Sequence, residues 1–149
     1  MPTVFDPAAR ATLAARMERV PPERAPLWGR MSAPQMLCHV SDGLRAALGE
    51  LPVTSRGNAL FTNPVVRWLL IYALPWPKGK AQAAPEMLTT QPAEWAADLA
   101  TFRGLLEGAG TRGPGGAWPA HPRFGALSGR AWGALMHRHL DHHLRQFGV

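Results

Sequence analysis

The feature that most constrains the fold is the periodicity of residues 128–147, where large side chains recur at the spacing of an α-helix. Histidines take positions in this stripe that leucine would ordinarily fill. In order, the stripe contains Trp132, Leu135, Met136, His139, His142 or His143, and Gln146. Buried polar side chains need partners. We therefore expect a final helix that packs against an element able to supply partners for imidazoles.

Three earlier segments carry helix signals. Residues 6–17 begin with Asp-Pro, a cap followed by a proline suited to the first position, and continue with many alanines. Residues 32–48 begin with Ser-Ala-Pro-Gln, which has the form of a capping box. Residues 92–107 place apolar side chains on one face, and the glycine-rich run 108–116 is predicted to be a flexible stop.

The connection between the second and third long helices is unusually long. Residues 49–91 are interrupted repeatedly by proline and glycine, and only residues 64–74 are apolar enough to predict a short buried helix. No alternating strand pattern and no internal repeat is present. The sequence therefore predicts one all-α domain over residues 1–149, a four-helix bundle with one long crossover.

Charge and composition narrow the function. The formal net charge is +6, but the basic residues are scattered without a run of five like charges, which disfavours nucleic-acid binding. One cysteine excludes an internal disulfide framework and fits a reducing compartment. The N-terminus does not resemble a secretory signal, and the most apolar stretch is too short to span a bilayer and contains Arg67. We expect a cytoplasmic protein without a membrane partner.

The histidines suggest a metal site. In a helix, His139 and His143 stand one turn apart and can hold one ion, with His142 as the reserve candidate and His137 on the far side. A third ligand must come from another inward face, and His39 in the second helix fits best. These three imidazoles suit Zn²⁺, Ni²⁺ or Fe²⁺ and leave at least one position for water.

Other polar residues are candidates for supporting roles. Glu86, in a proline-bounded loop, is a candidate general acid or base, or else a structural residue. Asp42, one turn after His39, either orients that ring or is solvated. His142, if it is not a ligand, is a catalytic or other pocket residue or a surface residue. His121, which follows Pro119-Ala120, fixes its loop or lines the pocket.

Several motifs together resemble the DinB-like four-helix bundles. This family includes bacterial thiol-dependent transferases and relatives of maleylpyruvate isomerase. The resemblance lies in Trp28-Gly-Arg-Met-Ser-Ala-Pro-Gln-Met-Leu-Cys before His39 and in His139-Leu-Asp-His-His143-Leu-Arg-Gln146. The stretches Pro75-Trp-Pro-Lys-Gly-Lys, Pro85-Glu-Met-Leu-Thr-Thr and His121-Pro-Arg-Phe-Gly are similar to a branch of unknown function.

The resemblance implies a bundle with an unusual helix order, a divalent ion at His39, His139 and His143, and frequently a homodimer. It also implies a metal-dependent transferase that uses a low-molecular-weight thiol, or a hydrolase, acting on a small electrophilic molecule. A non-catalytic protein that binds a metal or small ligand on the same bundle is the alternative, because a fold does not decide between them.

Overall fold

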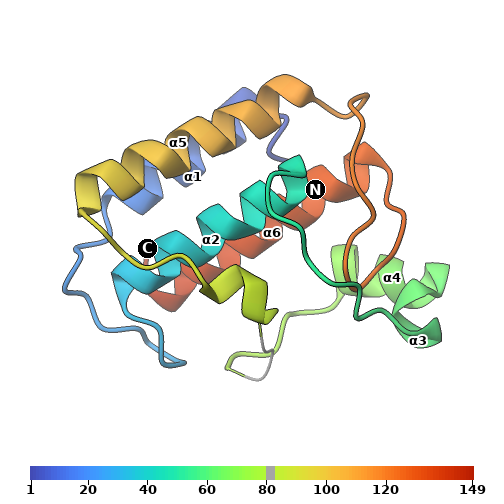
Figure 1. The fold of residues 1–149 in the computed structure, drawn as a ribbon, viewed down its shortest axis with the longest axis horizontal. Helices are drawn as coiled ribbons and strands as arrows, with labels where there is room; N and C mark the ends of the chain where they lie inside the picture. Colours follow the sequence, from blue (N-terminus) through green and yellow to red (C-terminus); the bar gives the residue numbers. More distant parts are fainter. Residues whose placement is uncertain (80–82) are drawn as a thin grey trace.

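The computed structural model describes residues 1–79 and 83–149 and is all-helical (Figure 1). Within these ranges it has six α-helices and no strand, which confirms the predicted all-α class. The four long helices are α1 (Pro7–Glu18), α2 (Ala33–Leu48), α5 (Trp95–Arg112) and α6 (Gly129–Gln146). Helix α2 packs against α5 and α6, and α1 packs against the same two helices, so all four surround one apolar core.

Side-chain caps explain where the long helices begin. Asp6 accepts a hydrogen bond from the Ala8 amide at 3.0 Å at the start of α1. Ser32 and Gln35 form the predicted capping box at the start of α2, with a bond of 2.9 Å from the Ser32 amide to the Gln35 side chain. Helix α6 begins after Ser128, whose hydroxyl accepts from the Ala131 amide. These caps replace helical bonds that the first amides of a helix cannot make.

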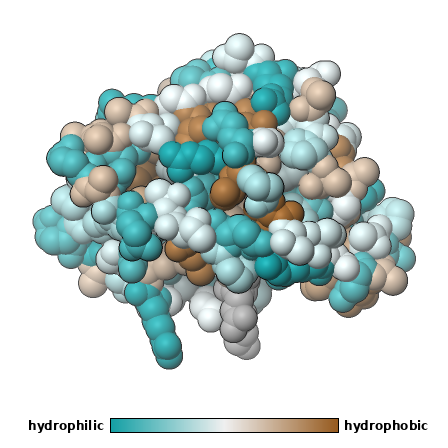
Figure 2. Space-filling view, in the orientation of Figure 1, coloured by the Kyte–Doolittle hydropathy of each residue, from teal (hydrophilic) through white to brown (hydrophobic). Residues whose placement is uncertain are grey.

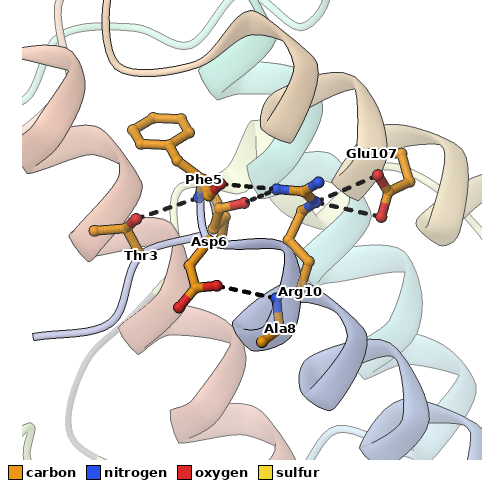
Figure 3. A network of polar contacts seen from close by, with 7 residues as sticks. Thr3, Phe5, Asp6, Ala8, Arg10 and Glu107 are labelled. Carbon is orange, nitrogen blue, oxygen red and sulfur yellow. Dashed lines mark hydrogen bonds and ion pairs between the residues drawn. The ribbon is translucent and has the colours of Figure 1, made fainter.

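An arginine connects the N-terminal segment to the third long helix. The Arg10 guanidinium donates to the carbonyls of Val4 and Phe5 at 2.9 and 3.1 Å and forms an ion pair with Glu107 of α5 (Figure 3). A Cβ at Gly110 would lie 2.4 Å from Cζ of Arg10, so a larger residue at this position would displace the Arg10 guanidinium from its present place.

The prediction that the glycine-rich run after residue 107 ends the third helix was wrong in part. Helix α5 begins at Trp95, with Glu94 as its cap, and continues through Gly108 and Gly110 to Arg112. Ala109 is fully buried in the core, and Gly110 receives Arg10. Packing of α5 against α1 and α2 therefore outweighs the low helix propensity of its glycines.

The crossover is a chain of short helical turns. It contains α3 (Ala59–Thr62), α4 (Pro64–Trp68), a π-helical turn η1 (Leu69–Ala73) and a 3₁₀ turn η2 (Pro85–Leu88). The prediction of a short buried helix over residues 64–74 was right that the segment is helical, since α4 and η1 cover it, but wrong about burial: Ile71 is buried, whereas Val65 and Trp68 are exposed. The segment packs one side on α6, where the Arg138 guanidinium donates to the Ile71 carbonyl at 2.9 Å, and turns the other side outward.

The surface of the molecule includes hydrophobic as well as hydrophilic residues. In the face shown in Figure 2, hydrophobic residues are visible between hydrophilic ones near the middle of the molecule. No helix in the described ranges combines the length and the apolarity that crossing a membrane requires. Of the Pro75-to-Lys80 stretch used for the resemblance, Lys80 lies outside the described residues.

Candidate metal centre

Helices α2 and α6 bring three histidines from distant parts of the chain together. His39 lies on the buried face of α2, and His139 and His143 lie one turn apart on α6. One ring nitrogen from each residue lies within 4.8 Å of the others, and Nε2 of His39 is 3.1 Å from Nε2 of His139. The structure therefore brings together the residues that the helical spacing predicted as ligands.

A backbone carbonyl fixes the tautomer of His39. Its Nδ1 lies 3.0 Å from the carbonyl oxygen of Met87 in η2. Because a carbonyl can only accept, Nδ1 of His39 must carry the proton and Nε2 keeps its lone pair. A proton donated from the outer nitrogen to a carbonyl is the usual support for a metal-binding histidine. The lone pair of Nε2 points to His139.

The second support involves Gln146, one turn after His143. The amide nitrogen of Gln146 donates to the carbonyl of Trp28 at 2.6 Å, which directs its oxygen to Nδ1 of His143 at 2.8 Å. Nδ1 of His143 therefore donates, and Nε2 is the nitrogen with the free lone pair. The loop before α2 thus determines which nitrogen of His143 is available.

His139 is accommodated by a glycine on the facing helix. A Cβ at Gly43 would lie 3.1 Å from Cε1 and 3.2 Å from Nδ1 of His139, closer than ordinary contacts. Because Nε2 of His39 is an acceptor, Nε2 of His139 donates to it in this arrangement. Binding of a cation through Nε2 of His139 would therefore require the other neutral tautomer of this ring, with the proton on Nδ1.

Burial keeps the three imidazoles neutral. It lowers the pKa of His39, lowers that of His139 well below its ordinary value, and lowers that of His143 to about 3. The neighbouring imidazoles add to the effect on His139 and His143, because a second positive charge at this place is unfavourable. Neutral imidazole is the form that binds a metal.

The donor set fits a transition metal. Two nitrogens bound to one zinc ion at tetrahedral angles lie about 3.3 Å apart, close to the observed separation of the two Nε2 atoms. Imidazoles without carboxylates suit Zn²⁺, Ni²⁺ or Fe²⁺ rather than Mg²⁺ or Ca²⁺. Cys38 is buried, and burial raises the pKa of its thiol to about 11, which keeps it protonated. Three protein ligands leave a coordination position for water or substrate.

The three histidines form part of the wall of a cavity of about 500 Å³. This volume is in the range of small-molecule sites. The wall is mostly apolar and comes from α2, α6, the crossover and the turn before α6, with members that include Val40, Leu44, Phe61, Leu70, Phe124 and Leu135. A small molecule in the cavity would therefore reach the histidine group from an apolar chamber.

His142 lines the same cavity but does not join the group of three nitrogens. Its ring lies between the indoles of Trp28 and Trp76, at centroid distances of 5.9 and 5.8 Å. Of the two adjacent histidines, His143 is therefore the one that faces His39. His142 is available to contact a molecule in the cavity, whereas His137 stands apart from the group near Asp141 and Arg16.

The structure does not bring Glu86 into the site. Its carboxylate forms an ion pair with Arg56 at 2.8 Å and accepts from the Thr54 amide, and Glu86 does not line the cavity. The Arg56 guanidinium lowers the pKa of this carboxyl to about 2, so it stays ionised. A carboxylate occupied in this way is poorly suited to the acid or base role that the sequence suggested.

Asp42 does not orient His39 either, because the Met87 carbonyl occupies that position. Asp42 is not solvated, as the alternative prediction had it, but buried: its carboxylate accepts hydrogen bonds from Arg45 at 2.8 Å and from the Thr90 hydroxyl at 2.7 Å. The Arg45 contact lies within α2, whereas the Thr90 contact connects α2 to the end of the crossover, close to η2.

Sequence reasoning missed two supports of the site. No residue type marks the Met87 carbonyl, because every residue has one. Gly43 was also missed, although a glycine one turn after His39 on the inward face of α2 could have indicated that another side chain packs closely there. Gln146 was predicted as a member of the helical stripe, and the structure shows that its side chain orients His143.

Comparison with known proteins gives a family without an assigned activity. The sequence model of a family described as "Protein of unknown function (DUF1569)" matches residues 10–148. Comparisons with curated proteins and with solved structures found no match. The match spans α2, the crossover and α6, and so includes every residue of the histidine group. The chain therefore belongs to the DUF1569 family.

Proposed function

We propose that this chain is a metal-dependent enzyme with the DinB-like four-helix bundle, and that His39, His139 and His143 hold its divalent transition metal. One observation carries the proposal: the outer nitrogens of His39 and His143 each donate to a fixed acceptor, so their inner nitrogens present lone pairs on the same side as His139. Histidines with a purely structural role do not require their outer nitrogens to be fixed in this way, whereas here two of the three histidines are fixed so.

The proposed reaction is transfer of a low-molecular-weight thiol, or hydrolysis, on a small molecule bound in the cavity. A divalent ion at the three nitrogens would lower the pKa of a bound water or thiol and so supply a nucleophile at neutral pH. His142, on the cavity wall beside Trp28 and Trp76, is the residue placed to exchange a proton with the reactants. The apolar wall excludes water from the reacting groups.

The metal is tested first. Protein purified without a histidine tag should contain close to one equivalent of zinc, nickel or iron, and zinc should raise its melting temperature. His143→Ala should abolish zinc binding, whereas His137→Ala, the matched control on the same helix, should not. Less than about half an equivalent of any transition metal, together with stability that chelators leave unchanged, would contradict the proposal.

A second experiment separates an enzyme from a binding protein. A panel of thiols is combined with electrophilic acceptors, and product formation is compared for zinc-loaded protein, metal-stripped protein and His39→Ala. We expect turnover only in the zinc-loaded wild type. Turnover that survives His39→Ala would exclude the proposed mechanism. Stoichiometric binding of thiol or acceptor without turnover would favour the non-catalytic alternative.

A further inference from the structure

The cavity has a charge preference that the histidine group does not explain. Apart from its histidines, Arg123 is the only ionisable side chain that lines the cavity in the described part of the chain. No aspartate or glutamate of the described residues lines it. Arg123 itself is exposed to solvent, so a ligand that carries a charge near it is favoured when that charge is negative.

Arg123 belongs to a tightly fixed turn before α6. His121 and Gly125 exchange two backbone hydrogen bonds, at 2.8 and 2.9 Å, which close the turn. The amide of Arg56 donates to the Pro122 carbonyl at 2.8 Å, and a Cβ at Gly57 would lie 2.7 Å from the Arg123 carbonyl oxygen. The crossover thus packs against this turn and is hydrogen-bonded to it.

The same turn fixes the tautomer of His121. Its Nδ1 accepts from the backbone amides of Arg123 and Phe124 at 3.0 and 3.1 Å. Since Nδ1 accepts twice, the proton of the neutral ring must be on Nε2. Burial and the nearby Arg123 charge lower the pKa of His121 to about 4, so the ring is neutral at neutral pH. Within the described ranges, no protein acceptor for Nε2 is found.

The His121 ring forms part of the cavity wall, beside Phe124 and Trp132 at centroid distances of 4.8 and 5.1 Å. The Arg123 guanidinium lies 5.1 Å from the centroid of the Phe61 ring, which also lines the cavity. No ion pair holds Arg123 among the described residues, whereas the guanidinium of Arg56 is paired with Glu86. The turn therefore places two groups on the cavity wall: the Nε2–H donor of His121 and the guanidinium of Arg123, which forms no ion pair with a described residue.

We propose that His121 and Arg123 bind the carboxylate of a small, otherwise apolar substrate. This inference rests on the proposed function, because it assigns a substrate class to the chamber beside the histidine group. A guanidinium and an N–H donor match the two oxygens of a carboxylate, and the apolar wall accommodates the remainder of the molecule. The carboxylate anchors one end, and the other end lies in the chamber toward His39, His139 and His143.

The test compares organic acids with their neutral amides. Hexanoate and 3-phenylpropanoate, each paired with its primary amide, are titrated by calorimetry into metal-stripped and zinc-loaded protein. In metal-stripped wild type we expect each acid to bind at least about tenfold more tightly than its amide. Arg123→Gln should reduce the affinity for the acids about tenfold and leave that for the amides unchanged, and Arg123→Lys should restore most of the preference.

Two further variants keep the test specific. His121→Asn retains an acceptor for the two backbone amides but removes the Nε2 donor, so it should also weaken binding of the acids alone. Arg19→Gln removes an equal charge outside the cavity wall and should change nothing. Equal affinity for acid and amide in wild type, or no saturable binding of either acid, would overturn the inference.

The outcomes also separate this inference from the proposed function. A preference for acids that requires zinc and is insensitive to Arg123→Gln would mean that the ion binds the carboxylate, which overturns the inference and leaves the metal site standing. An Arg123-dependent preference in protein that binds no zinc would support the inference and remove the proposed enzyme mechanism.

Discussion

The side-chain oxygen of Gln146 lies 2.8 Å from Nδ1 of His143, three residues earlier on α6. Because the Trp28 carbonyl fixes the amide of Gln146, the imidazole of His143 can present only Nε2 to the group. A ligand candidate and the residue that orients it thus come from the same helix. The loop before α2 controls both.

Removing this support should weaken metal binding without removing a ligand. Gln146→Met keeps the length of the side chain but cannot accept from His143, and we expect zinc affinity to fall about 10–100-fold. Competition with a chromophoric chelator measures the change. Gln91→Met, at an exposed glutamine, is the control and should bind zinc like the wild type. Equal affinities for the two variants would show that Gln146 does not orient the ligand.

Gly43→Ala should separate stability from metal affinity. Alanine favours a helix by about 1 kcal/mol over glycine, but the new Cβ would press on the His139 ring. We expect zinc affinity to fall at least about tenfold while α2 remains folded. The control is Gly104→Ala on α5, where an added Cβ meets no described atom within 4 Å. That variant should be more stable and bind zinc normally, as measured by urea unfolding and zinc titration.

Glu86→Gln tests the residue that the structure leaves outside the site. Its carboxylate is held by Arg56 and the Thr54 amide, away from the cavity. We expect zinc affinity to change less than about twofold, because an exposed ion pair contributes little. Any zinc-dependent turnover should also persist. A large loss of turnover at unchanged zinc affinity would return Glu86 to the role of acid or base.

His121 should make the fold sensitive to acid. Burial lowers the pKa of His121 to about 4, whereas in the unfolded chain it returns to its ordinary value near 6.5. Between these values the unfolded state binds more protons, so the free energy of unfolding falls as the pH falls from 6.5 toward 4. Urea unfolding of zinc-free protein at pH 7 and pH 4.5 measures this loss.

His121→Asn isolates the contribution of His121, because asparagine does not titrate. The difference in unfolding free energy between wild type and variant should shift by about 2 kcal/mol between these pH values, in the direction that makes wild type relatively less stable in acid. A difference that is the same at both pH values would contradict the assignment.

The long helices were predictable where local chemistry determines their ends. Ser32 and Ser128 cap α2 and α6 with their own side chains, and both predicted starts agree with the structure within one residue. The end of α5 was not predictable in the same way. Gly108 and Gly110 disfavour a helix locally, and the packing of α5 on α1 and α2 that outweighs them comes from other parts of the chain.

The site was predictable to the extent that helical spacing controls it. The four-residue separation of His139 and His143 and the inward position of His39 pointed to the three residues that the structure brings together, with His142 left as the reserve candidate that the structure does not bring into the group. The path of the crossover was not predictable from the sequence, because its prolines exclude long regular helices without specifying which conformation the chain adopts instead. The hydrogen bond between His39 and the Met87 carbonyl and the ion pair between Glu86 and Arg56 both depend on that path.

His39 and His139 are 100 residues apart in the chain, yet their Nε2 atoms are 3.1 Å from each other. An ion shared by them would therefore act as a cross-link that closes a loop containing most of the protein. Closing so long a loop restricts the unfolded chain far more than joining near neighbours does. The ion would then stabilise α3, α4 and α5, none of which supplies a ligand, because all three lie within the closed loop.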